Sequence, residues 1–246
     1  GTVKDIKSAT FDQELKTKGT GFNAKLGFII SPSEYFRFGY SFHSPTTYNL
    51  KDSYEYVISS TFDNGAVDAA GGSRKNSTIS TDITGYKYKI TTPARHIFSV
   101  AMVNKEVGFI SMDLEYVNYT EASLYAKDYK FVEENRRISK NYNGGAWNLR
   151  LGGELVQDKF RFRAGYARYP SPYTTSIVPD LRILVNNVYT AGFGIKTDNY
   201  SFDMAYVNSG YSDYYIPYTL SSGKHPTASN NVRTSNVVFT VGLNLD

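Results

Sequence analysis

Apolar and polar side chains alternate over residues 146–168, and this period of two residues constrains the fold more than any other feature of the chain. One strand face carries Trp147, Leu149, Leu151 and Leu155, and the other carries Asn148, Arg150, Gly152 and Glu154. After Gln157 and Asp158 the pattern restarts, with Phe160, Phe162, Ala164 and Tyr166 opposite Arg161, Arg163 and Gly165. The segment predicts a tight hairpin with one apolar and one charged face.

The composition favours strands and leaves a membrane protein possible. The chain of 246 residues has 22 Tyr and 15 Phe but one Trp, and its mean hydropathy is −0.40. No run approaches the ~18 apolar residues of a membrane helix, yet barrel strands alternate lipid-facing with lumen-facing residues and escape that test. The absence of Cys is compatible with an exported barrel. A net charge of +4 without a basic cluster in the sequence gives no reason to expect a nucleic-acid partner.

Nine segments carry the strand pattern, and their connections alternate strictly in length. The predicted strands are about 20–30, 35–44, 94–103, 107–119, 146–156, 159–168, 187–196, 199–208 and 234–245. Short turns at 31–34, 104–106, 157–158 and 197–198 alternate with long connections at 45–93, 120–145, 169–186 and 209–233. Outer-membrane barrels have this asymmetry. A water-soluble β-sandwich is the alternative, but it gives no reason for connections sorted by length.

The sequence therefore predicts an all-β fold, an antiparallel transmembrane β-barrel of the outer-membrane type, in one domain over residues 1–246. The long connections are expected to extend some strands beyond the membrane, with 80–92 as the best candidate. The segment 2–18 is charged and unpatterned, supplies no convincing strand and is expected to be the tail of an external loop. Because complete bacterial barrels have even strand numbers, nine strands suggest the C-terminal part of a larger barrel. Such a part has two unpaired edges and must close, pair with another copy, or rearrange.

Several segments together resemble one family. The run GTGFNAKLGFIISPSEYFRFGYSFHSP at 19–45, ITTPARHIFSVAMV at 90–103, MDLEYVNYTEASLY at 112–125 and the segment 148–207 resemble FadL-type outer-membrane transporters of long-chain fatty acids and aromatic hydrocarbons. The similarity covers the C-terminal part of that family only. The family's N-terminal hatch and early strands have no counterpart, and the end in Asn-Leu-Asp departs from the usual terminal aromatic residue.

The resemblance implies passive uptake of hydrophobic small molecules across a bacterial outer membrane, with the ligand and membrane lipid as partners and without a cofactor. Ligands would be captured by external loops and pass into the barrel interior. The connection 169–186 holds apolar and aromatic candidates for that capture, which are Tyr169, Tyr173, Ile177, Val178, Leu181 and Ile183. A capture surface and simple packing of the loop over the lumen are equally compatible with these residues.

The predicted lumen face holds the second set of candidates. Its charged and titratable residues are Arg37, His43, Asp113, Glu115, Arg150, Glu154, Arg161, Arg163 and Asp203. Among them Arg37, Arg150, Arg161 and Arg163 are candidate ligands for a carboxylate headgroup, because a guanidinium donates paired N–H bonds. The stronger alternative is a ladder of charges of both signs that neutralise one another. The sequence alone does not identify any one arginine as the headgroup ligand.

Catalysis and metal binding have little support in the sequence. There is no G-x-S-x-G, H-E-x-x-H, phosphate-loop or paired-Cys pattern, and the histidines are His43, His96 and His225. We therefore expect neither an enzyme nor a metal site. Two alternatives to a fatty-acid channel remain open: a haem uptake receptor, because His and Tyr can ligate iron, and a surface or adhesion barrel that transports nothing.

Overall fold

The computed structural model describes residues 6–62, 76–174, 185–215 and 228–243, which divide into two compact units. Unit 1 comprises Gly1–Phe22, Thr47–Ile90 and Leu124–Phe131, and unit 2 comprises the rest of the chain. The chain passes between the units several times. The prediction of one domain over 1–246 stays a prediction.

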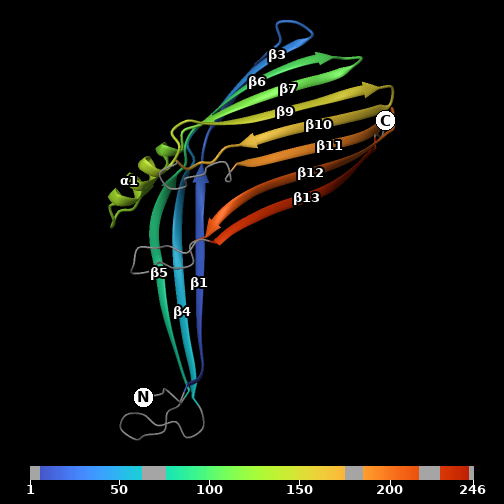
Figure 1. The fold of residues 1–246 in the computed structure, drawn as a ribbon. Helices are drawn as coiled ribbons and strands as arrows, with labels where there is room; N and C mark the ends of the chain where they lie inside the picture. The colour runs from blue at the N-terminus through green and yellow to red at the C-terminus, as the bar shows by residue number, and fades with distance from the viewer. Residues whose placement is uncertain (1–5, 63–75, 175–184, 216–227, 244–246) are drawn as a thin grey trace, which may run out of the picture. The chain divides into compact units, whose positions relative to one another are not determined.

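Unit 2 is built on a sheet of nine strands, and all nine predicted strands are present in it. They are β2 (Lys25–Ile30), β3 (Phe36–His43), β6 (Arg95–Asn104), β7 (Gly108–Val117), β9 (Ala146–Gln157), β10 (Phe160–Tyr169), β11 (Asn186–Lys196), β12 (Tyr200–Tyr215) and β13 (Ala228–Leu243). Each pairs antiparallel with the next of the nine (Figure 1). The edges of this sheet are β2 and β13.

Short turns join alternate pairs of these strands, as predicted. The β9–β10 hairpin pairs Gln157 with Phe160, and Asp158 in its turn has φ of 51°. At the start of β7, Gly108 has φ of 128°, and an added Cβ would overlap the Glu154 carbonyl oxygen of β9. Only glycine fits there, because it tolerates both the left-handed backbone and the close approach of β9.

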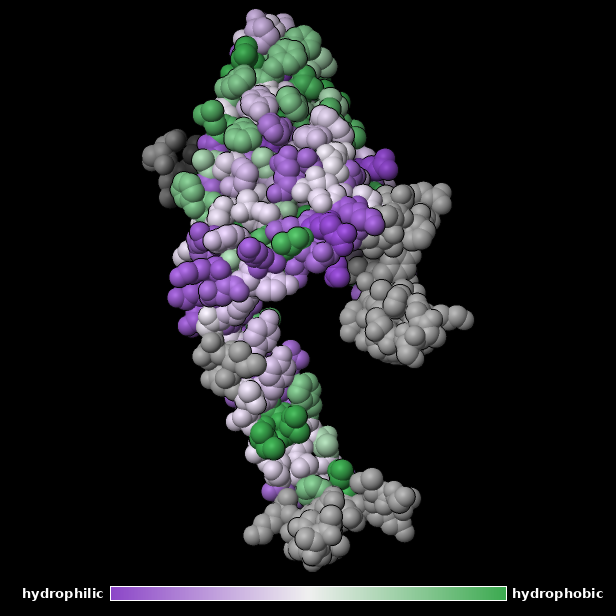
Figure 2. Space-filling view, turned by 90° about the vertical axis from the view of Figure 1, so that its left-hand side faces the viewer, coloured by the Kyte–Doolittle hydropathy of each residue, from purple (hydrophilic) through white to green (hydrophobic). Residues whose placement is uncertain are grey.

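The two faces of the nine-stranded sheet differ in polarity. Large apolar side chains on one face are exposed, among them Phe28, Phe38, Phe98, Ile110, Leu151, Phe162, Met204 and Val241. Figure 2 shows apolar residues at the surface at the top of the view, at the height of the β2–β3 turn. In the described part of the chain, only Val117, Ala126 and Ala146 are buried apolar residues. The second layer that a β-sandwich would place on this face is not among the described residues.

Unit 1 contains a four-stranded sheet in the order β1-β4-β5-β8, formed by β1 (Ile6–Phe22), β4 (Thr47–Phe62), β5 (Ser77–Thr91) and β8 (Ser123–Tyr125). The extended segment predicted at 80–92 is confirmed by β5. The prediction that 2–18 supplies no strand is wrong from Ile6 onward, because β1 pairs antiparallel with β4 along its length. Residues 2–5 lie outside the described residues. Hydrogen bonds to β4 hold β1 extended even though both faces are exposed, so no apolar periodicity marks it in the sequence.

The connection between β7 and β9 contains two short helical elements in addition to β8. They are η1 (Tyr119–Glu121) and α1 (Val132–Asn141). Glu133 and Glu134 lie in the first turn of α1 and Lys140 in its last turn, so the charges complement the helix dipole. Among the described residues, no helix combines the length and apolar character needed to cross a membrane.

Candidate functional site

The polar face of the nine-stranded sheet carries a network of ion pairs centred on β10. Arg163 Nε donates to Glu154 Oε2 of β9 at 2.6 Å, and Arg163 NH1 donates to Asp203 of β12. Arg161 Nε lies 3.8 Å from the same Glu154 carboxylate. Arg163 reaches across β11 because Gly194 has no side chain there, and an added Cβ would overlap the Asp203 carboxylate. One glycine thus lets a salt bridge join strands that are not neighbours.

A second polar cluster surrounds Glu115 of β7, whose exposed fraction is 5%. Asn148 Nδ2 donates to Glu115 Oε1 at 2.8 Å, and Arg150 NH1 and NH2 lie 3.4 Å from Glu115 Oε2. Arg95 NH1 lies 3.8 Å from Glu115 Oε1. Arg150 also lies 3.6 Å from Asp113 and hydrogen-bonds Tyr169. The buried charge of Glu115 is tolerated because Asn148, Arg150 and Arg95 surround its carboxylate.

Three of the four candidate arginines therefore contact carboxylates of the chain itself. Arg150, Arg161 and Arg163 have the partners that a self-neutralising charge ladder requires. Arg37 differs, because it has no carboxylate within 4.0 Å in the described part of the chain, and its side chain is exposed. Of the four candidates, Arg37 is the one whose N–H groups do not bind a described acidic side chain.

Arg37 lines a cavity of about 650 Å³ bounded by β2, β3, β6 and β7. The cavity exists because the side chains between its walls are small, namely Gly39, Ser99, Ala101 and Ser111. These residues occupy neighbouring register positions, with Gly39 opposite Ser99 and Ala101 opposite Ser111. Asp113 lines the same cavity but is drawn toward Arg150. The arrangement leaves room beside a guanidinium that pairs with no carboxylate among the described side chains.

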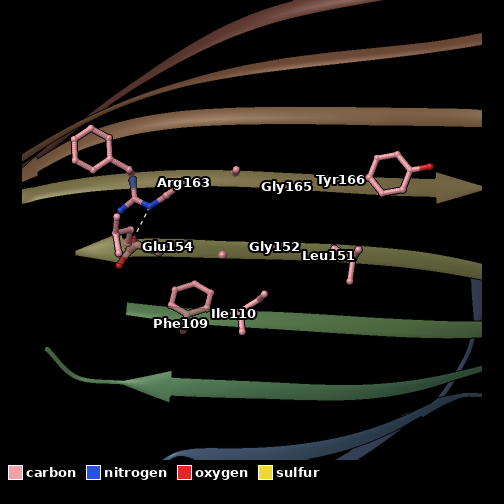
Figure 3. Close-up of a pocket in the computed structure, with 12 residues that line it drawn as sticks. Phe109, Ile110, Leu151, Gly152, Glu154, Arg163, Gly165 and Tyr166 are labelled. Carbon is pink, nitrogen blue, oxygen red and sulfur yellow. Dashed lines mark hydrogen bonds and ion pairs between the residues drawn. The ribbon is translucent and has the colours of Figure 1, made fainter. Parts of the chain in front are cut away.

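A second cavity of about 660 Å³ lies where β7, β9 and β10 meet, and residues of both sheet faces line it (Figure 3). Gly152 is paired with Gly165 on the polar face, and Gly153 with Ala164 on the apolar face. In Figure 3 the Glu154–Arg163 ion pair lies toward one end of the drawn strands, and Leu151 and Tyr166 lie further along the same two strands. At this point the sheet presents almost bare backbone on both sides.

The candidate capture loop is described only at its ends. Ile177, Val178, Leu181 and Ile183 lie outside the described residues. Tyr169 ends β10 and is placed beside Arg150, whereas the Tyr173 ring lies 5.0 Å from the Tyr142 ring. The structure therefore brings one loop tyrosine to the polar face and packs the other against the segment after α1.

Sequence reasoning missed several residues that shape this face. Asn148 and Arg95 both hold Glu115, and Gly194 lets Arg163 reach Asp203. The alternation of side chains places Asn148 on the polar face, so its amide could have been predicted as a partner for a charged residue there. The contact of Arg163 with Asp203 across Gly194 depends on the register of the strands, which the sequence does not give. Burial raises the pKa of the nearby Tyr119 hydroxyl; the Glu115 carboxylate also raises it, and Arg95 lowers it.

Histidines and acids do not gather into a metal site in the described ranges, where no group of three or more such residues could hold an ion. His96 belongs to the apolar face, and its Nδ1 lies 2.9 Å from the Tyr40 hydroxyl. No protein-family model and no curated protein matches this chain. The FadL-type resemblance therefore stays a prediction.

Proposed function

We propose that the nine-stranded sheet is the transmembrane wall of a bacterial outer-membrane β-barrel that passes hydrophobic small molecules, such as long-chain fatty acids or aromatic hydrocarbons. The observation that carries the proposal is the contrast between the faces of this sheet. One face exposes large apolar side chains, and the other holds paired ions around cavities.

Lipid is the environment that suits the apolar face. Soluble monomers rarely expose apolar patches larger than a few hundred Å², and burial stabilises by roughly 25 cal/mol per Å² of apolar surface. Strand length supports the same reading. A tilted strand needs about 9–11 residues to cross a bilayer, and β6, β7, β10 and β11 have 10, 10, 10 and 11 residues.

Passage along the polar face is supported by its combination of paired charges and small side chains. Arg150, Arg161 and Arg163 have their charges balanced within the wall, so a mainly apolar molecule meets few unpaired charges. The cavity beside Arg37 leaves space for a ligand, and Gly152 adds no side chain to the same face. An aliphatic chain with one carboxylate would match this surface, because Arg37 is the one of the four candidate arginines that is not paired with a carboxylate in the described part of the chain.

A bulky side chain on the polar face tests the proposal. At Gly152 the nearest atoms to an added Cβ are Ser111 Oγ at 3.9 Å and the Ala164 carbonyl oxygen at 4.0 Å, so a substitution fits locally. Gly152→Phe should slow uptake of a fluorescent long-chain fatty acid by cells that carry the protein in their outer membrane. Ala164→Phe places the same ring on the apolar face and should leave uptake near the wild-type rate.

Haem serves as the comparison ligand in both variants, and surface abundance is measured in each. Normal fatty-acid uptake with lost haem binding would favour a haem receptor instead. If the wild-type protein supports uptake of neither ligand, the proposal fails and a barrel that only binds surface partners becomes the better explanation.

A further inference from the structure

Lysines from three strands of the unit 1 sheet and from the segment after β8 line one cavity of about 510 Å³. We call it the lysine cavity. It is lined by Lys18 of β1, Lys51 of β4, Lys87 and Lys89 of β5, and Lys127, two residues beyond the end of β8. These residues are far apart in the sequence, and only the pairing of β1, β4, β5 and β8 brings them together.

Strand pairing places several of these exposed lysines at neighbouring positions. Lys18 stands directly opposite Lys51 in the antiparallel β1–β4 pair, an arrangement in which like charges destabilise a sheet. Lys87 and Lys89 are two residues apart, so both project from the same face of β5. Lys89 Nζ lies 6.0 Å from the centre of the Tyr125 ring, which places it toward β8. Such a cluster is costly unless negative charge compensates it.

The described residues do not supply that negative charge. None of the twelve residues that line the lysine cavity is acidic. Among the side chains that the structure describes, which do not include that of Asp82, no carboxylate lies within 4.0 Å of the five lysines, whereas Lys16 outside the cavity is paired with Glu14 at 3.0 Å.

Asp52, the acidic residue next to Lys51, is already engaged. Its exposed fraction is 6%, and Thr17 Oγ1 donates to it at 2.8 Å. Tyr88 also hydrogen-bonds this carboxylate, and burial together with that bond raises the pKa of the Tyr88 hydroxyl. Strand alternation puts Asp52 on the face opposite Lys51. Asp52 therefore does not neutralise the cavity.

We infer that the lysine cavity binds a compact anion that carries two or more phosphate charges. The side chains decide the chemistry, because the cavity contains lysines and no arginine. Lysine acts on phosphate as a point charge, whereas planar, bidentate recognition of carboxylates favours arginine. A cavity lined by one sign of charge also concentrates counter-ions. Its volume lies within the range of about 300–1,000 Å³ that is usual for small-ligand sites.

Binding of inorganic pyrophosphate to the full chain tests the inference by calorimetry. Wild-type protein should bind it saturably, and added salt should weaken the binding because exposed charges are screened. The combined variant Lys18→Gln, Lys51→Gln and Lys87→Gln should bind at least about tenfold more weakly, a modest figure for three exposed charge contacts. The variant should fold at least as well as wild type, because it relieves repulsion, and circular dichroism checks this.

A matched variant removes the same charge elsewhere. Lys105→Gln, Lys159→Gln and Lys196→Gln lie in or beside short turns of unit 2 and should leave pyrophosphate affinity within about twofold of wild type, because screening limits their reach. An equal loss in both variants, or citrate bound as tightly as pyrophosphate, would overturn phosphate recognition. Vesicles of phosphatidylcholine with and without phosphatidic acid separate the sources. Binding only to the phosphatidic acid vesicles assigns the phosphate to a lipid headgroup, and binding to neither probe refutes the site.

The inference does not depend on the proposed channel. Pyrophosphate binding is measured without transport, and the lysines belong to unit 1, whereas the uptake test alters unit 2. Each result therefore stands without the other.

Discussion

Glu115 is a buried carboxylate at the centre of one polar cluster on the nine-stranded sheet. It meets Asn148, Arg150 and Arg95. Glu115→Gln keeps the shape of the side chain but removes the charge between two arginines. We expect unfolding in lipid vesicles, followed by urea titration, to show a loss of about 1–3 kcal/mol, as for other buried hydrogen bonds to charged groups.

Asp113→Asn is the comparison, because Asp113 contacts only one arginine of the same network. Its side chain is 39% exposed and lies 3.6 Å from Arg150, which retains Glu115 as a partner. Solvent screening should hold the loss below about 1 kcal/mol. If the two substitutions cost the same, burial of Glu115 does not set the strength of this network.

At the scale of residues, the sequence predicts faces but not partners. Alternation placed Arg163, Glu154 and Asp203 on one face, and all three meet there. It did not indicate that Arg163 would reach Asp203 rather than remain available to a ligand, because that contact crosses the glycines of β11. The sequence likewise does not show that Arg37 differs from Arg150, Arg161 and Arg163. That Arg37 has no described carboxylate partner becomes visible only in the structure, where the acidic side chains have positions.

At the scale of elements, neighbouring positions of β13 offer a direct test of the two faces. Val241 is on the apolar face with an exposed fraction of 69%, and Thr240 lies opposite Asp203 in the register with β12. In a membrane-inserted protein, Val241→Arg should cost about 2–4 kcal/mol if the site is near the bilayer midplane. Thr240→Arg should cost less, because its guanidinium can approach the Asp203 carboxylate.

Urea titration of both variants in vesicles of one lipid composition measures the difference. A larger cost for Thr240→Arg than for Val241→Arg would mean that the assignment of the faces is inverted. A similar small cost for both would argue against lipid on either side of β13.

The elements of unit 2 were predictable because each strand differs between its faces. All nine strands and the short turns between them follow from period-two alternation and turn residues. The strand β1 carries charged and apolar residues on exposed faces, and β8 has only three residues, so neither has a readable pattern. The helix α1 did carry a signal, in Glu133 and Glu134 at its start and Lys140 near its end.

At the scale of the whole molecule, the chain assembles features that no local segment contains. The sequence has no basic cluster, yet the lysine cavity collects five lysines from positions 18 to 127. The sheet edges at β2 and β13 likewise follow from pairing rather than from any sequence motif. Unpaired edges invite pairing with another strand. Closure of this sheet into a barrel would require strand partners for β2 and β13, and the periodicity of the nine strands does not identify them.

The alternation of short turns with long connections predicts which parts of unit 2 face outward. If the sheet spans an outer membrane, the short turns lie on the periplasmic side and α1, in the connection between β7 and β9, lies outside. Single cysteines replacing Lys105 and Lys159 in short turns should therefore be protected from an impermeant thiol reagent on intact cells. A cysteine replacing the exposed Lys140 of α1 should react.

The chain has no native Cys, so each variant reports a single site. After the cells are opened with detergent, all three cysteines should react, which shows that protection reflects the membrane rather than burial. Equal labelling of the three variants on intact cells would remove the transmembrane assignment, because a sheet that does not cross a membrane has no reason to hide its short turns. Labelling of the turn sites alone would retain the membrane but reverse the orientation, and α1 would then lie in the periplasm.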